Sequence, residues 1–181
     1  MKKLLFVLLL SLFLAACGSN EPTTDAMAVG SKDNKASIIE NDYGQTYEIV
    51  NWYVSDDTDD EGFNEMDFKG YKVKFSMAAV KDEEGNEYIG FFAETENTTD
   101  RPVHYNGDME IVTDNQDQTY NDDGIGSSEP GVKIKGFSAA PLEYGTPESF
   151  TVTFEPPYLD NNGSYSEGGF GDNIEMEFKK E

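Results

Sequence analysis

Hydrophobic and polar residues alternate through most of the chain after residue 40. The clearest case is segment 71–77 (YKVKFSM), in which every second residue is apolar. A period of two predicts a strand with one face buried. The same kind of pattern predicts eight short strands, at 47–54, 71–77, 88–97, 103–105, 109–112, 132–137, 150–154 and 173–179.

Turn-forming residues separate these segments. Residues 82–87 (DEEGNE) include Gly85, which is suited to a positive φ, and residues 116–130 form a long polar stretch predicted to be a loop. No segment after residue 40 has a helical period. Short strands at spacings of roughly 8–15 residues predict an all-β fold, an antiparallel sandwich of about seven or eight strands. A closed barrel fits the same periodicity.

The N-terminus has the order of a secretory signal. A basic start, Met1–Lys3, precedes the apolar run 4–14, and Ala15, Ala16, Cys17 and Gly18 follow. The run has 11 residues, whereas a bilayer-spanning helix needs about 20. We therefore predict a signal peptide, residues 1–16, cleaved between Ala16 and Cys17.

This cleavage site resembles the lipobox of bacterial lipoproteins. The resemblance implies that Cys17 carries a diacylglycerol and anchors the chain at the extracytoplasmic face of the cell membrane. Cys17 is the only cysteine, so lipidation leaves no thiol for a disulfide, a thiolate metal site or a cysteine nucleophile.

Residues 17–40 are small and polar, without a sustained apolar period. We predict a lipid-anchored flexible linker over 17–40 and one domain over 41–181. Fully extended, residues 18–40 span at most roughly 80 Å, and a flexible chain of this length typically spans about 27 Å.

The chain is strongly acidic, with 36 Asp and Glu against 13 Lys and Arg. Removing the leader takes away Lys2 and Lys3, which leaves 11 basic residues and a net side-chain charge of −25. Nucleic acids are not expected as partners because binding a phosphate backbone depends on clustered basic residues. The charge favours solubility, or attraction of cations or of a basic partner.

Two stretches carry a resemblance to a known family. The first is 91–106 (FFAETENTTDRPVHYN), and the second is 129–154, with EPG, KGF and the strand ESFTVTF. Together they resemble the immunoglobulin-like domains of unknown function in Gram-positive surface lipoproteins. The resemblance covers roughly residues 45 to 155 and implies an immunoglobulin-like sandwich. It carries no catalytic residues. The acidic insertion at 56–67 and the tail from Pro156 fit it poorly.

The insertion contains a candidate Ca²⁺ site. Asp57, Asp59 and Glu61, followed by Gly62, match the first half of an EF-hand loop. The position that needs a bidentate Glu is occupied by Phe68, so a solvated loop is the competing interpretation. A second acidic loop contains Asp114, Asp117, Asp122 and Asp123.

We do not expect an enzyme. His104 is the only histidine, and zinc sites need three or four nitrogen or sulfur ligands. A Ser-His-Asp triad could use only His104, and no nucleophile-elbow sequence accompanies it. A hydrogen-bonded residue on a short strand is the simpler interpretation.

Segment 156–171 (PPYLDNNGSYSEGGFG) is the best candidate for partner binding. Tyr158, Tyr165 and Phe170 lie among Asn, Ser and Gly, the mixture that recognition loops use. These aromatic residues could instead fold back and cover one end of the domain. We therefore expect a non-catalytic membrane-anchored lipoprotein that binds a protein or an envelope component. The alternative is a Ca²⁺-dependent binding or structural module.

Overall fold

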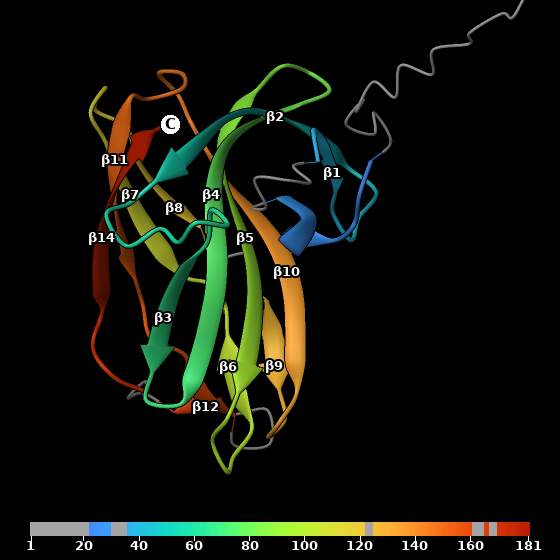
Figure 1. Ribbon diagram of the computed structural model, residues 1–181, viewed down its shortest axis with the longest axis vertical. Coiled ribbons are helices and arrows are strands. Elements are labelled where there is room, and N and C mark those ends of the chain that lie inside the picture. Colours follow the sequence, from blue (N-terminus) through green and yellow to red (C-terminus); the bar gives the residue numbers. More distant parts are fainter. Residues whose placement is uncertain (1–21, 30–35, 122–124, 161–164, 167–169) are drawn as a thin grey trace, which may run out of the picture.

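The predicted all-β, antiparallel fold is confirmed by the computed structural model (Figure 1). It describes residues 22–29, 36–121, 125–160, 165–166 and 170–181. The elements are η1, a 3₁₀ helix (Ala26–Val29), and the strands β1 (Ile38–Glu40), β2 (Thr46–Val54), β3 (Asn64–Phe68), β4 (Tyr71–Asp82), β5 (Glu87–Asn97), β6 (Val103–Tyr105), β7 (Met109–Thr113), β8 (Gln118–Asn121), β9 (Gly126–Ser128), β10 (Lys133–Pro141), β11 (Ser149–Phe154), β12 (Tyr158–Asp160), β13 (Tyr165–Ser166) and β14 (Ile174–Lys180).

Ten of these strands form one sheet, which curls round on itself. The strand order is β10-β5-β4-β2-β14-β11-β7-β8, with β1 beside β2 and β3 beside β4. β2 joins the two halves because it pairs with β4 and also, at Tyr53 and Val54, with β14. The ends of the sheet approach each other where Asn121 Nδ2 on β8 donates to Ser138 Oγ on β10, at 2.5 Å. The sheet is thus close to a closed barrel.

The main core lies between the two halves of the rolled sheet. Phe75 on β4 and Phe91 on β5 contact Phe154 on β11, with ring centroids 5.1 and 5.7 Å apart. Phe178 on β14 packs 6.2 Å from Phe75. All four rings are fully buried, so the alternation predicted for strands 71–77, 150–154 and 173–179 reflects one shared core.

A second apolar cluster lies on the outer face of β4, β5 and β10, beside the turn that joins β4 to β5. Phe92 stacks on Phe137 at 4.8 Å, and Ala26 and Ile39 cover this cluster, with exposed fractions of 1% and 0%. Thr23 forms a parallel bridge to Ile39. The described residues 22–29, which we call the strap, therefore pack against the sheet. The expectation of a linker as far as residue 40 is wrong for the strap and for 36–40.

The structure has more strands than the seven or eight expected from the sequence, and most of the additional strands are short. β3 lies in the acidic insertion, where Asn64, Met66 and Phe68 point inward. β8 and β9 lie inside the stretch expected to be a loop. Backbone pairing with β7 and β6 holds them, and their sequences lack apolar alternation, so periodicity could not reveal them.

Candidate functional site

The small sheet, in the order β13-β12-β6-β9, places three polar residues side by side. His104 on β6 lies directly opposite Ser127 on β9 and opposite Tyr158 on β12. Residues directly opposite in neighbouring strands share a face. Ser127, His104 and Tyr158 therefore form a row across three strands, which we call the His104 strip. Two residues that sequence analysis treated separately, His104 and Tyr158, are brought together here.

Hydrogen bonds fix the imidazole of His104. Its Nδ1 lies 2.8 Å from Ser127 Oγ, and its Nε2 contacts Asn106 Oδ1. Asn106 Nδ2 in turn donates to Asp108 Oδ2 at 3.3 Å. The Asn106 contact identifies Nε2 as the protonated nitrogen, because an amide oxygen only accepts. In the neutral imidazole of this tautomer, Nδ1 accepts from the serine hydroxyl.

Tyr158 supplies the aromatic part of the strip. Its hydroxyl donates to Glu155 Oε2 at 3.4 Å. Burial is the largest cause that raises the pKa of Tyr158, and the carboxylates of Asp108 and Glu155 raise it further. The hydroxyl is therefore a neutral donor at physiological pH.

The strip points away from the other layer of the domain. Val103 and Tyr105, on either side of His104, are buried in the main core. The ring of Tyr105 lies 5.6 Å from Tyr71 on β4. Side chains alternate between the two faces of β6, so His104 points outward. Its direction is opposite to the direction in which the outer face of β4 points.

The three predicted partner-binding residues have different positions. Tyr158 belongs to the strip. Tyr165 lies on β13 opposite Asp160, and its side chain is outside the described part. Phe170 is half-buried against the main core, and its N–H donates to the carbonyl of Pro157 at 3.0 Å. Phe170 therefore folds back against the domain, as the alternative to a partner-binding role expects.

The acidic insertion forms a hydrogen-bonded turn around Asp59. Asp59 Oδ1 accepts from the N–H groups of Glu61 and Phe63, at 2.8 and 2.9 Å. Lys74 Nζ lies 3.9 Å from Asp59 and 3.5 Å from Glu61. Asp57 is exposed, and its N–H donates to Ser55 Oγ at 3.1 Å. Among the described residues no group of three acidic, His or Cys side chains is close enough to hold a metal ion. The Ca²⁺ site stays a prediction.

The second acidic loop ties two hairpins together. Asp117 is buried, and its carboxylate accepts from the N–H groups of Glu143 and Tyr144 at 3.1 and 3.0 Å. Asp114 Oδ1 accepts from the N–H of Glu148 at 3.2 Å. These two acids hold the β10–β11 loop against the β7–β8 turn. Asp122 and Asp123 lie outside the described residues.

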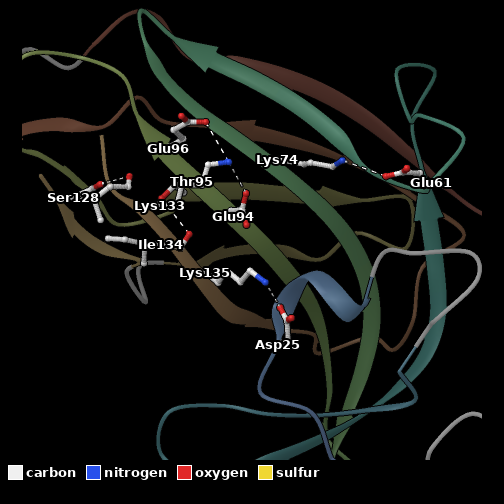
Figure 2. Close-up of polar contacts among 11 residues, drawn as sticks. Asp25, Glu61, Lys74, Glu94, Thr95, Glu96, Ser128, Lys133, Ile134 and Lys135 are labelled. Atoms are coloured by element: carbon white, nitrogen blue, oxygen red, sulfur yellow. Dashed lines mark hydrogen bonds and ion pairs between the residues drawn. The ribbon is translucent and has the colours of Figure 1, made fainter. Parts of the chain in front are cut away.

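The outer face of β3, β4, β5 and β10 carries a different surface, the mixed-charge face (Figure 2). Lys74 lies opposite Glu65 on β3 and Glu94 on β5. Lys133 reaches Glu94 at 3.2 Å and Glu96 at 3.4 Å. The face comprises Glu65, Asp67, Lys72, Lys74, Glu94, Glu96, Lys133 and Lys135. Seven of these residues, all but Lys135, contribute to the lining of a trough of about 450 Å³.

The predicted anchor, Cys17 with its cleavage partner Ala16, lies outside the described residues. Within the described ranges, none of the helical structure is long and apolar enough to span a bilayer.

Sequence reasoning missed the partners of His104. Ser127 and Asn106 follow no recognised motif, and only the pairing of β6 with β9 puts Ser127 beside the histidine. A weak signal was available, because Asn106 and Asp108 follow His104 at spacings of two along a short strand and its extension.

Comparison with known proteins gave no relatives: no protein-family model, no curated protein and no solved structure matches this chain.

Proposed function

We propose that this chain is a non-catalytic bacterial lipoprotein that binds a protein or an envelope component. In this proposal the signal peptide is removed, a diacylglycerol with palmitate-type acyl chains is attached to Cys17, and the domain stays at the extracytoplasmic face of the cell membrane. The order Ala16-Cys17-Gly18 after a short apolar run supports the anchor.

The finer fold belongs to the same proposal. We describe the domain as immunoglobulin-like because β4, β5 and β10 form one layer and β7, β11 and β14 form the other, with aromatic rings between them. The continuity of the sheet through β2 departs from a sandwich of two separate sheets.

The observation that supports a binding role most is the His104 strip. A half-buried tyrosine ring beside a fixed imidazole, a serine and an asparagine offers contact area together with hydrogen-bonding groups. Such rigid aromatic and polar groups, already held in place, lose little conformational entropy on binding. The partner would contact the outer face of the small sheet.

The test uses the full lipidated chain, tagged at the C-terminus and solubilised in detergent. Crosslinked partners from the envelope of the parent cells are identified by mass spectrometry. Tyr158→Ala and His104→Ala should each lower the yield of the same partner about tenfold or more, as expected for central contact residues. Tyr43→Ala is the matched control, because Tyr43 is 90% exposed and remote from the strip in sequence. Equal yields from all variants would remove the strip from the proposal.

One observation favours a second candidate, hydrolysis. Nucleophilic catalysis uses a hydroxyl, an imidazole that acts as its base and a group that orients the imidazole. Ser127, His104 and Asn106 lie in this order of contacts. A hydrolase would cleave an activated ester and lose that activity in both Ser127→Ala and His104→Ala. The binding proposal expects no turnover that depends on either residue.

A further inference from the structure

The strap brings the domain close to the proposed lipid anchor. Thr23 N–H donates to the carbonyl of Ile38 at 3.0 Å, and Glu40 N–H donates to the carbonyl of Thr23 at 2.8 Å. Lys135 on β10 forms an ion pair with Asp25 at 2.8 Å. The strap is therefore attached to the sheet at Thr23, and residues 18–22 separate this contact from Cys17.

Covalent geometry limits the distance between domain and membrane. Six Cα–Cα steps join Cys17 to Thr23, and fully extended they span at most roughly 22 Å. The linker expected from sequence, residues 18–40, would have allowed roughly 80 Å. The side of the domain that carries the strap is consequently the side that lies nearest the lipid headgroups.

The mixed-charge face lies on this side. Along β10, Lys133 and Lys135 share the outer face with Phe137 and Ala139, which belong to the cluster under the strap. Figure 2 shows Lys135 reaching Asp25 just before η1, with Lys133, Glu94 and Glu96 on the neighbouring part of the same face. The strap thus covers the apolar half of this outer surface and leaves the charged half open.

The charge of this face differs from that of the rest of the protein. Its eight residues are four lysines and four carboxylates and sum to zero, whereas the whole chain carries −23. Three further carboxylates, those of Asp25, Asp59 and Glu61, pair with its lysines at its edges. Bacterial membranes that contain anionic lipid repel an acidic surface over about a Debye length, roughly 8–10 Å at physiological salt. A face that carries this many lysines approaches such a membrane with less repulsion than the rest of the acidic surface.

Alternating columns of charge run along the strands of this face. Glu65 and Asp67 on β3 flank the lysines of β4, and the glutamates of β5 come next. Neighbouring strands lie about 4.8 Å apart, so an ammonium and a carboxylate are adjacent across the trough. Such a surface complements a phosphate joined to an amine through a short linker. Lys72 is exposed and lies opposite Asp67 and Glu96, and its ammonium offers a phosphate a charge-assisted contact.

We propose that the mixed-charge face rests on the membrane and binds zwitterionic headgroups that carry a phosphate and an ammonium group, as phosphoethanolamine does. This inference rests on the proposed anchor at Cys17. It also assigns the two outer surfaces different partners, because the His104 strip points away from the mixed-charge face and remains open to an envelope component.

The test measures how close each surface lies to the headgroups. The full lipidated chain is reconstituted in vesicles of phosphatidylethanolamine and phosphatidylcholine that contain a headgroup-attached nitroxide. A fluorophore is placed on one new cysteine, Glu65→Cys on the mixed-charge face or Val112→Cys on β7, whose side chain is 47% exposed on the opposite layer. Cys17 is acylated and does not react with the label.

The proposal predicts quenching several-fold stronger for the Glu65→Cys label than for the Val112→Cys label. Equal quenching, or stronger quenching at Val112→Cys, overturns it. Failure of the chain to sediment with the vesicles indicates instead that the anchor itself is absent. The double charge reversal Lys72→Glu with Lys133→Glu should abolish the difference between the two labels while sedimentation is unchanged.

Lipid composition tests the headgroup class. Replacing phosphatidylethanolamine by phosphatidylglycerol, which has the phosphate but no amine, should weaken quenching at Glu65→Cys. Unchanged or stronger quenching on phosphatidylglycerol would show that the lysines act alone, and it would overturn the zwitterionic assignment.

Discussion

Asp25, which precedes η1, forms an ion pair at 2.8 Å with Lys135 on β10, 110 positions away in the sequence. The contact joins the segment nearest the predicted anchor to an edge strand of the main sheet. Figure 1 shows η1 lying against β10, on the side of the molecule where β1 also lies. The pair therefore holds the strap in the orientation on which the membrane-facing proposal depends.

This ion pair should make the strap sensitive to acid. The hydrogen bond from Lys135 is the largest cause that lowers the pKa of Asp25 below its ordinary value of 3.8. A lowered pKa in the folded state contributes stability above pH 3.8, and that contribution is lost as the pH falls through the folded-state pKa. Both side chains are half exposed, so Asp25→Asn should cost at most about 1 kcal/mol at pH 7.

The measurement is the unfolding free energy of Asp25→Asn and of the wild type between pH 7 and pH 3. The difference between the two proteins should shrink as the pH falls below 3.8. Asp60→Asn, at an exposed position of the acidic insertion, is the control and should show no such trend. A difference that grows toward low pH would contradict the assigned role of the pair.

Ile39 tests whether residues 36–40 belong to the folded domain. It is fully buried in the cluster that contains Phe92 and Val80. Ile39→Ala should leave a cavity and lower the free energy of unfolding by about 2–4 kcal/mol. Tyr43→Ala, only four residues away but 90% exposed, should change the stability by less than about 0.5 kcal/mol. If urea unfolding shows the two variants to be equally stable, this segment is not packed as described.

Asp117 holds the β10–β11 loop. Asp117→Asn replaces one carboxylate oxygen by an amide N–H₂, so one of the N–H groups of Glu143 and Tyr144 loses its acceptor. Losing a buried acceptor costs about 1–3 kcal/mol. Hydrogen exchange should accelerate at residues 143 and 144 and stay unchanged in β4. Asp57→Asn, on the exposed insertion, is the matched control. Uniform acceleration over the whole sheet would point to global destabilisation instead.

The competing interpretation of the acidic insertion, a solvated loop, predicts that calcium does not stabilise the protein. Lys74 lies within 4 Å of both Asp59 and Glu61, so a cationic side chain already neutralises two of the three predicted ligands. We expect the same melting temperature with millimolar Ca²⁺ and with a chelator at equal ionic strength. A ligand that binds only the folded state raises the midpoint, and a rise that Asp59→Asn abolishes would restore the insertion as a Ca²⁺ site.

The long strands could be predicted from sequence because their alternation is hydrophobic. Phe75, Phe91 and Phe154 sit in strands with a clear period of two and meet in one core. β8 was missed because only Asn121 in it is buried. The docking of the strap was missed for a similar reason: Ala26 is small, and its burial depends on apolar residues such as Phe92 that lie far along the chain.

The candidate site was predicted in fragments. Tyr158 was selected for its aromatic ring among small polar residues, and His104 was selected because it is unique in the chain. Neither choice identified the other residue as its neighbour, since β6 and β12 are about 50 positions apart and pair only through the small sheet. Ser127 carried no sequence signal because serine is common in exposed loops.

The most direct test of the account is the location and acylation of the full-length chain in the cells that produce it. After growth with an alkyne analogue of palmitate, the wild type should be found in the membrane fraction, carry the label and begin at Cys17. Cys17→Ser should carry no label and appear in the medium. Wild-type levels of membrane-bound, labelled protein in Cys17→Ser would contradict the lipid anchor, on which both the proposed function and the membrane-facing surface depend.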